Sequence, residues 1–179
     1  RAVGADLAVA GLALADMPGM AGRGERHTIA TADGGEALLI DESYNANPAS
    51  MRVTIESLGL QPASRHIVVL GAMLELGEGG PAYHAELAMP IAKAGVALAI
   101  LVGEETQILA ETLGKSLEKP IETLHVADAA AALKALSARL QAGDAVLVKG
   151  SNAIGLSKLV QQLIKGPGGQ PSHGAAANG

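Results

Sequence analysis

The residues best suited to chemistry lie between Asp41 and Met51, in the run Asp-Glu-Ser-Tyr-Asn-Ala-Asn-Pro-Ala-Ser-Met. This run combines two adjacent carboxylates, a phenol and two amides, all of which form hydrogen bonds with polar ligands. It follows an apolar stretch that ends at Ile40 and precedes a segment whose apolar residues recur with helical spacing. Open α/β sheets bind ligands where a strand leads into a helix, so we expect a binding site here.

The same run also has a purely structural interpretation. Asn47 is a suitable N-cap residue for a helix, and Pro48 fits the first helical turn, where a missing N–H leaves no bond unmade. A solvated turn that only caps a helix would use the same two residues. Both interpretations remain open on the residues of this run alone.

Two further segments place polar residues directly after short aliphatic strands. Residues 71–77 include Glu75, and residues 149–152 begin with Lys149. Because the carboxyl ends of parallel strands share one edge of a sheet, these segments and residues 41–51 would line one crevice. Lys149 is suited to contact an anion, although lysines at strand ends often only extend toward water. Glu75 has the ordinary alternative of a solvated loop carboxylate.

Arg23 and Arg26 lie in a Gly-rich segment that suits a domain hinge. Guanidinium groups there can bind phosphates or carboxylates through two parallel hydrogen bonds. The alternative is that these arginines only keep an exposed linker soluble.

Two common kinds of site are not expected from the sequence. Residues 114–116 (Gly-Lys-Ser) look like the end of a phosphate-binding loop, but Leu109 stands where that loop needs a second glycine. The five histidines show no ligand spacing with one another or with acidic residues, so we expect no zinc or iron site. His84 is expected to cap a helix or to lie on the surface.

The composition favours one α/β domain with an aliphatic core. The chain has 179 residues, of which 49% are hydrophobic, with no Phe and no Trp. Its 13 Lys+Arg against 18 Asp+Glu, and its lack of stacking aromatics, argue against a nucleic-acid partner. The absence of cysteine fits a reducing cytosol, and no apolar run of about eighteen residues suggests a membrane span.

Short aliphatic strands alternate with helical segments along most of the chain. A hairpin is predicted from two strands, residues 28–31 and 37–40, joined by Ala-Asp-Gly-Gly. Further strands are predicted at residues 66–70, 97–102, 123–126 and 145–148, and helices at 83–93, 105–117, 129–140 and 154–164. This alternation predicts a mostly parallel sheet with helices on both faces. Pro90 should kink or split its helix.

The two ends of the chain differ from this pattern. Residues 1–17 look helical but have no start signal and no preceding Met, and residues 18–27 form a Gly/Arg-rich linker. We therefore expect a fragment of a larger protein. Residues 166–179 are rich in Gly, Pro, Ala and Asn and are expected to be a disordered tail.

Four segments together resemble the C-terminal domain of the Mur ligases. They are residues 22–24 (Gly-Arg-Gly), 41–51, 69–77 (Val-Leu-Gly-Ala-Met-Leu-Glu-Leu-Gly) and 148–151 (Val-Lys-Gly-Ser), in this order. The resemblance implies a Rossmann-like domain over residues 21–165. It also implies that residues 1–20 are the end of a central ATPase domain.

The resemblance further implies an ATP-dependent amide ligase for peptidoglycan precursors in the bacterial cytoplasm. A carboxylate of UDP-N-acetylmuramoyl-tripeptide would become an acyl phosphate, which the amine of D-alanyl-D-alanine would attack. ATP with Mg²⁺ would be bound mainly by the central domain, so the isolated chain is expected to be inactive, and we expect a monomer. The alternatives are another ligase of the superfamily, including the folylpolyglutamate type, and a stand-alone Rossmann-like binding module without catalysis.

Carried over by position, the resemblance assigns roles to nine residues and no catalytic role. Arg23 would contact nucleotide phosphates or ribose, Asp41 or Glu42 the ribose hydroxyls, and Tyr44, Asn45 and Asn47 the nucleotide-side wall, while Lys149, Ser151 and Glu75 would face the substrate. Family members often carry two Asp where this chain has Asp-Glu, so either carboxylate fits the ribose. Many also carry Asp where this chain has Ala72, so any role of that Asp is missing here.

Overall fold

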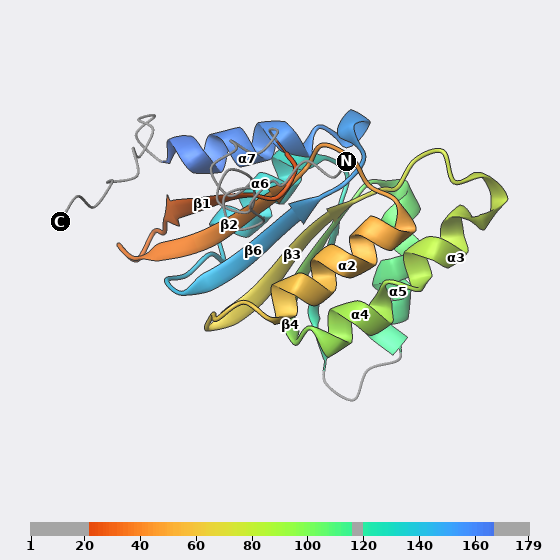
Figure 1. The fold of residues 1–179 in the computed structure, drawn as a ribbon, viewed down its shortest axis with the longest axis horizontal. Coiled ribbons are helices and arrows are strands. Elements are labelled where there is room, and N and C mark those ends of the chain that lie inside the picture. Colours follow the sequence, from red (N-terminus) through yellow and green to blue (C-terminus); the bar gives the residue numbers. More distant parts are fainter. Residues whose placement is uncertain (1–21, 116–119, 167–179) are drawn as a thin grey trace, which may run out of the picture.

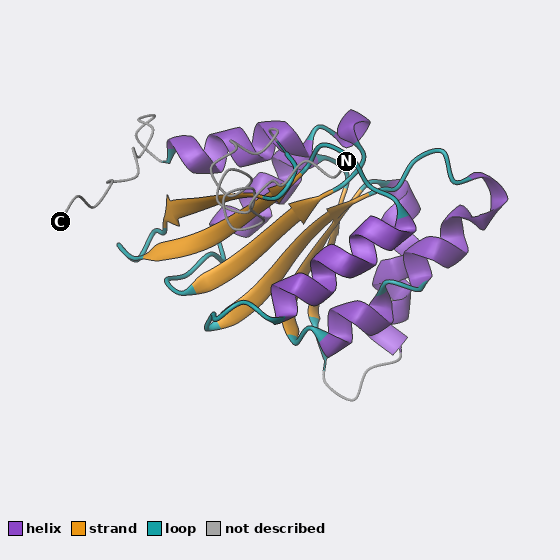
Figure 2. Cartoon of the chain, viewed as in Figure 1, coloured by secondary structure: helices purple, strands orange, loops and turns teal. Residues whose placement is uncertain are grey.

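The computed structural model describes residues 22–115 and 120–166, which form an α/β sandwich (Figure 1, Figure 2). The strands are β1 Glu25–Ala30, β2 Glu36–Glu42, β3 Arg65–Gly71, β4 Val96–Val102, β5 Glu122–Val126 and β6 Asp144–Lys149. The helices are α2 Pro48–Gly59, α3 Gly80–Ala85, α4 Ala88–Lys93, α5 Gln107–Lys115, α6 Ala129–Ser137 and α7 Leu156–Lys165. Short 3₁₀ turns at Gly77–Gly79, Glu104–Thr106 and Asn152–Ile154 precede α3, α5 and α7.

The strands form one sheet in the order β1-β2-β6-β3-β4-β5. β1 pairs with β2 antiparallel, and every other neighbouring pair is parallel. The predicted fold class is confirmed: a mostly parallel, Rossmann-like sheet with helices on both faces and one N-terminal hairpin.

The helices cover the two faces of the sheet in separate groups. α2, α4 and α5 pack on one face, and α6 and α7 pack on the other, with an aliphatic core under each group (Figure 1). On α2 the predicted apolar face is confirmed, because Met51, Ile55 and Leu58 are fully buried. We call the two sides the α2 face and the α7 face.

The position of β6 between β2 and β3 creates a switch point in the sheet. The chain leaves β2 and enters α2 on one face, whereas it leaves β6 and enters α7 on the other face. Neighbouring strands whose helices depart to opposite faces leave a crevice at their carboxyl ends. The loops after β3 and β6 approach closely there, since a Cβ atom on Gly150 would lie 2.9 Å from the Cα of Gly71.

Several predicted boundaries shift in the structure. Pro90 splits its helix as expected: α3 ends at Ala85, and Pro90 occupies the first turn of α4, where no intrahelical N–H bond is lost. The starts predicted at residues 105 and 154 are wrong, because 3₁₀ turns occupy these positions and α5 and α7 begin later. Likewise, α6 ends at Ser137 and not at Leu140.

Some predictions lie wholly or partly outside the described residues. These are the helix at residues 1–17, the start of the linker, and the tail after residue 166. Residues 114 and 115 end α5, so they do not follow a strand as a phosphate-binding loop requires. Among the described helices, none combines the length and hydrophobicity that crossing a bilayer requires.

Candidate functional site

The carboxyl ends of β2 and β6 bring Glu42 and Lys149 together as direct neighbours in the sheet. Lys149 Nζ lies 3.4 Å from Glu42 Oε2 and donates a 2.8 Å hydrogen bond to the carbonyl oxygen of Asn45. The side chain of Lys149 is only 3% exposed, whereas that of Glu42 is 23% exposed. The crevice therefore holds a buried ammonium group beside a carboxylate that reaches the surface.

The charge of Lys149 is disfavoured by its surroundings. Burial lowers the pKa of Lys149, the carboxylate of Glu42 partly offsets this effect, and the positive charge of Arg23 lowers the pKa further. Arg23 and Lys149 are therefore two cations close enough to repel each other. An anionic ligand would relieve their repulsion.

The loop after β2 is locked to the segment before β1 by backbone hydrogen bonds. Tyr44 donates its N–H to the carbonyl oxygen of Gly22 at 3.1 Å, and Gly24 donates to that of Asp41 at 2.8 Å. Gly22 has a φ of +76°, and a Cβ atom there would lie 2.9 Å from the nitrogen of Tyr44, so only glycine fits. This arrangement stacks the guanidinium of Arg23 over the ring of Tyr44, 4.4 Å from its centroid.

The acidic pair is divided between the two faces of the sheet. Asp41 shares a face with Leu39, in the core under α7; its carboxylate is buried and accepts the N–H of Ser43 at 2.9 Å. Glu42 points to the α2 face, where it meets Lys149. Of the two carboxylates, Glu42 is the one that lies in the crevice.

The two asparagines hold the connection into α2. Asn47 is its N-cap: its side chain accepts the N–H of Ser50 at 2.8 Å, and the Ser50 hydroxyl accepts the N–H of Asn47 at 3.1 Å. The side chain of Asn45 accepts the N–H of Ala46 at 2.8 Å, and its carbonyl oxygen binds Lys149. The capping interpretation of Asn47 is confirmed.

Ser151 joins the loop after β6 to the loop after β3. Its hydroxyl accepts the N–H of Leu74 at 2.9 Å, and its own N–H donates to the carbonyl oxygen of Ala72 at 3.1 Å. Glu75 follows in that second loop, exposed and with a φ of +63°. It borders a hollow of about 230 Å³ whose walls are mostly apolar and include Met73, Leu74, Leu76, Pro81, His84 and Glu105.

The expectation that His84 caps a helix or lies on the surface is wrong. His84 is 1% exposed, and its Nε2 accepts the N–H of Met73 at 2.9 Å. Its Nδ1 lies 2.7 Å from the carbonyl oxygen of Gly80, to which it donates. The imidazole therefore fixes the loop after β3 against α3.

The predicted site residues therefore do not form one site. Arg23, Glu42, Tyr44, Asn45 and Lys149 meet at the carboxyl ends of β2 and β6, and we call this group the β2–β6 corner. Ser151 and Glu75 belong to the loops around the hollow, Asn47 caps α2, and Asp41 faces away from the corner.

The fold is an α/β domain with charged side chains at a switch point of its sheet, the place where open sheets of this class bind ligands. The family model described as "Mur ligase, glutamate ligase domain" matches residues 22–152. The chain belongs to this family.

Relatives within the family share most of this chain but are much longer. A UDP-N-acetylmuramoyl-tripeptide–D-alanyl-D-alanine ligase from Synechocystis is 34% identical over 131 residues, which are 73% of this chain and 28% of that protein. The Mycobacterium leprae ligase of the same name is 37% identical over 148 residues, covering 74% of this chain and 28% of that protein. The chain thus spans less than a third of either relative.

A solved structure agrees with these relatives. The MurF ligase from Thermotoga maritima, in complex with ADP, superimposes with a TM-score of 0.65 and 26% identity. The match covers 83% of this chain and 32% of that one.

Proposed function

We propose that this chain is the C-terminal domain of a bacterial ligase that joins D-alanyl-D-alanine to UDP-N-acetylmuramoyl-tripeptide. The reaction would use ATP with Mg²⁺ in the cytoplasm, and it would form an amide through an acyl phosphate. The names of the relatives at 30–37% identity support this choice of substrates. The rest of each relative, which this chain does not match, would carry the phosphate-binding loop, so this domain would act by closing over the nucleotide.

The β2–β6 corner is the observation that carries the proposal. Arg23 and Lys149 supply positive charge suited to phosphate oxygens, and Glu42 supplies a carboxylate that can accept two ribose hydroxyls. Asp41 is not suited to that contact, because its carboxylate lies on the opposite face and is already bonded to Ser43. We therefore assign the ribose to Glu42.

The remaining predicted residues support the site in different ways. Ser151 and Asn47 hold the loops in place through the hydrogen bonds described above. Glu75 is exposed at the edge of the hollow, where a carboxylate suits the ammonium group of an incoming dipeptide. With two cations and one carboxylate, the corner is a poor set of Mg²⁺ ligands, so we expect the metal to be held by the rest of the protein.

The test uses the longer protein that contains this chain. Arg23→Ala should raise the Michaelis constant for ATP or lower turnover, because it removes a cation from the corner. Arg52→Ala is the matched control, since Arg52 is an exposed arginine on α2 that lies beside Glu86 and outside the corner. The role of Arg23 is wrong if both variants keep parental kinetics.

The purified 179-residue chain should show no ATPase activity. Robust ATP hydrolysis by this chain would refute the proposal that the phosphate-binding loop lies in the rest of the longer protein.

A further inference from the structure

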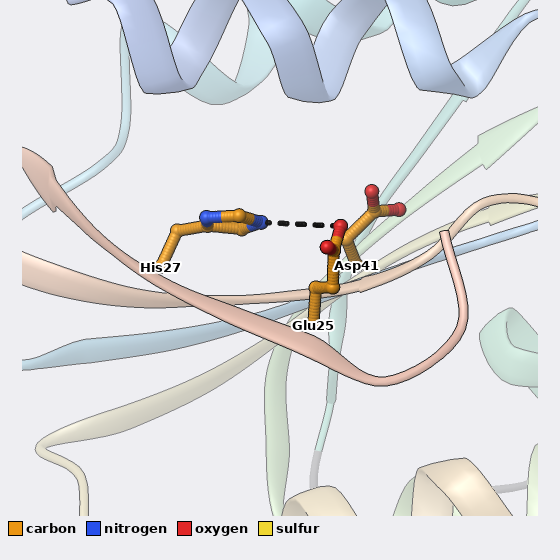
Figure 3. Close-up of side chains that lie close together, drawn as sticks. All are labelled: Glu25, His27 and Asp41. Carbon is orange, nitrogen blue, oxygen red and sulfur yellow. Dashed lines mark ion pairs between the residues drawn. The ribbon is translucent and has the colours of Figure 1, made fainter. Parts of the chain in front are cut away.

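Three potential metal ligands meet on the α7 face of the hairpin. One ligand atom from each of Glu25, His27 and Asp41 lies within 4.8 Å of the other two (Figure 3). Glu25 on β1 is the register partner of Asp41 on β2, and His27 lies two residues further along β1. Because side chains alternate along a strand, all three project to the same side of the sheet.

One ring nitrogen of His27, Nε2, is buried without a hydrogen-bond partner among the described residues. Figure 3 shows this nitrogen directed at the two carboxylates, with Glu25 Oε2 at 3.9 Å. Asp41 is 6% exposed and uses Oδ1 for the N–H of Ser43, which leaves its second oxygen available. Buried polar atoms are normally paired, so an occupant is indicated.

We propose that Glu25, His27 and Asp41 form a binding site for a divalent transition-metal ion such as Zn²⁺ or Mn²⁺. One imidazole nitrogen with two carboxylate oxygens suits these ions better than Mg²⁺ or Ca²⁺, which prefer oxygen ligands alone. At metal–ligand distances of about 2.0–2.2 Å, donors around one ion lie about 3.0–3.5 Å apart. The 3.9 Å separation of His27 and Glu25 needs only a small side-chain rotation on fixed strands. Three protein ligands leave a position for water.

This site is separate from the β2–β6 corner but mechanically joined to it. Asp41 and Glu42 are adjacent residues that project to opposite faces of β2. A metal ion would fasten the edge strand β1 to β2, beside the hydrogen bond from Gly24 to Asp41. It would therefore hold Arg23, which immediately precedes Gly24, in its place over Tyr44. The spacing of histidines and acids along the chain does not indicate this site, because Asp41 comes from the partner strand of the hairpin.

The competing explanation is a protonated His27 that forms an ion pair with the two carboxylates. Metal titration distinguishes the two, because an ion pair needs no metal. The probe is ZnCl₂, followed by isothermal titration calorimetry on the full 179-residue chain, and CoCl₂, followed by visible absorption. We expect the unmutated chain to bind one equivalent of Zn²⁺ tightly. Both His27→Gln and Glu25→Gln should raise the dissociation constant for Zn²⁺ at least ten-fold.

Two histidine variants serve as controls. His125→Gln removes an exposed imidazole from β5, and His173→Gln removes one near the C-terminus; both should leave Zn²⁺ affinity unchanged. A variant could lose Zn²⁺ binding only because it misfolds, so a further measurement uses the unmutated chain. In that chain, Zn²⁺ should slow hydrogen exchange of the β1 amides. The proposal is overturned if the unmutated chain binds no Zn²⁺ up to about 1 mM, or if His27→Gln binds it as well as the parent. Unchanged exchange in β1 at saturating Zn²⁺ would equally overturn it.

Discussion

Removing Glu42 and removing Lys149 should lower the stability of the chain by different amounts, because only Lys149 is fully buried. Glu42→Gln leaves an ammonium group that is 3% exposed, with the carbonyl oxygen of Asn45 as its remaining close partner. Lys149→Met leaves a carboxylate whose side chain is 23% exposed and reaches water. We therefore expect Glu42→Gln to lose more stability than Lys149→Met.

The size of the difference follows from the geometry. Two unit charges separated by the observed 3.4 Å attract by about 5 kcal/mol at an effective dielectric constant of about 20, which is an upper bound for the loss. Leaving a buried charge unpaired costs about 3–5 kcal/mol, and we expect the lower end because Lys149 keeps its 2.8 Å bond to Asn45. Lys149→Met should cost about 1 kcal/mol, since the burial penalty that lowers the pKa of Lys149 disappears with the ammonium group.

Urea unfolding at pH 7, followed by circular dichroism, measures both free energies of unfolding. The double variant should resemble Lys149→Met, because without the lysine the remaining group at position 42 has no buried charge to neutralise. The reasoning is refuted if Lys149→Met is as destabilising as Glu42→Gln, or if the double variant is the least stable of the three.

The same pair predicts a pH dependence with a definite sign. Burial lowers the pKa of Lys149 in the folded chain, so between that pKa and its ordinary value the unfolded chain binds more protons. Stability must then rise with pH across this window. Because Glu42→Gln removes a charge that raises the pKa of Lys149, its deficit relative to the parent should shrink as the pH increases from 7 toward 10, and a constant deficit would contradict this account.

Substitutions at three other positions test the framework of the site. Arg65→Met leaves the buried Asp144 without its 2.7 and 2.8 Å bonds, which should cost about 3 kcal/mol and lower the Tm by about 10 °C in calorimetry; an unchanged Tm would show the pair to be dispensable. His84→Ala removes the acceptor of the Met73 N–H, so stability should fall by about 1–3 kcal/mol and hydrogen exchange at Met73 should accelerate. Asn47→Ala should cost about 1 kcal/mol in urea unfolding, whereas Asn47→Ser should retain most of the cap, and equal losses would argue against capping.

The fold was predictable because its signals are local and repeated. Aliphatic runs of strand length, separated by segments with helical spacing, indicate a parallel sheet, and the Ala-Asp-Gly-Gly turn marks the hairpin. The exact start of α7 was harder to predict from the sequence. The apolar pattern continues back to Ile154, but Gly155 adopts a φ of +77° and separates a 3₁₀ turn from the helix.

The site was predictable only in part, because strand order determines which side chains meet. The sequence indicates that polar loops follow parallel strands, but not that β6 lies between β2 and β3. It shows Asp41 and Glu42 as one acidic pair, whereas the sheet separates them onto opposite faces. The burial of His84 depends on where the loop after β3 returns, and the approach of Asp41 to His27 depends on hairpin register. None of these contacts follows from residue types alone.

The electrostatics of the β2–β6 corner argue for a ligand that this chain does not supply by itself. Arg23 makes the charge of Lys149 less favourable, and Glu42 offsets only part of the burial penalty. Residues selected for stability alone would not place a second cation beside a buried one, since an apolar side chain in place of Lys149 would remove both penalties. An anion bound between Arg23 and Lys149 reverses this balance, because its charge favours both cations at once. A phosphate group presented by another part of a longer protein has that charge, so the electrostatics of the corner support the proposed closure of this domain over a nucleotide.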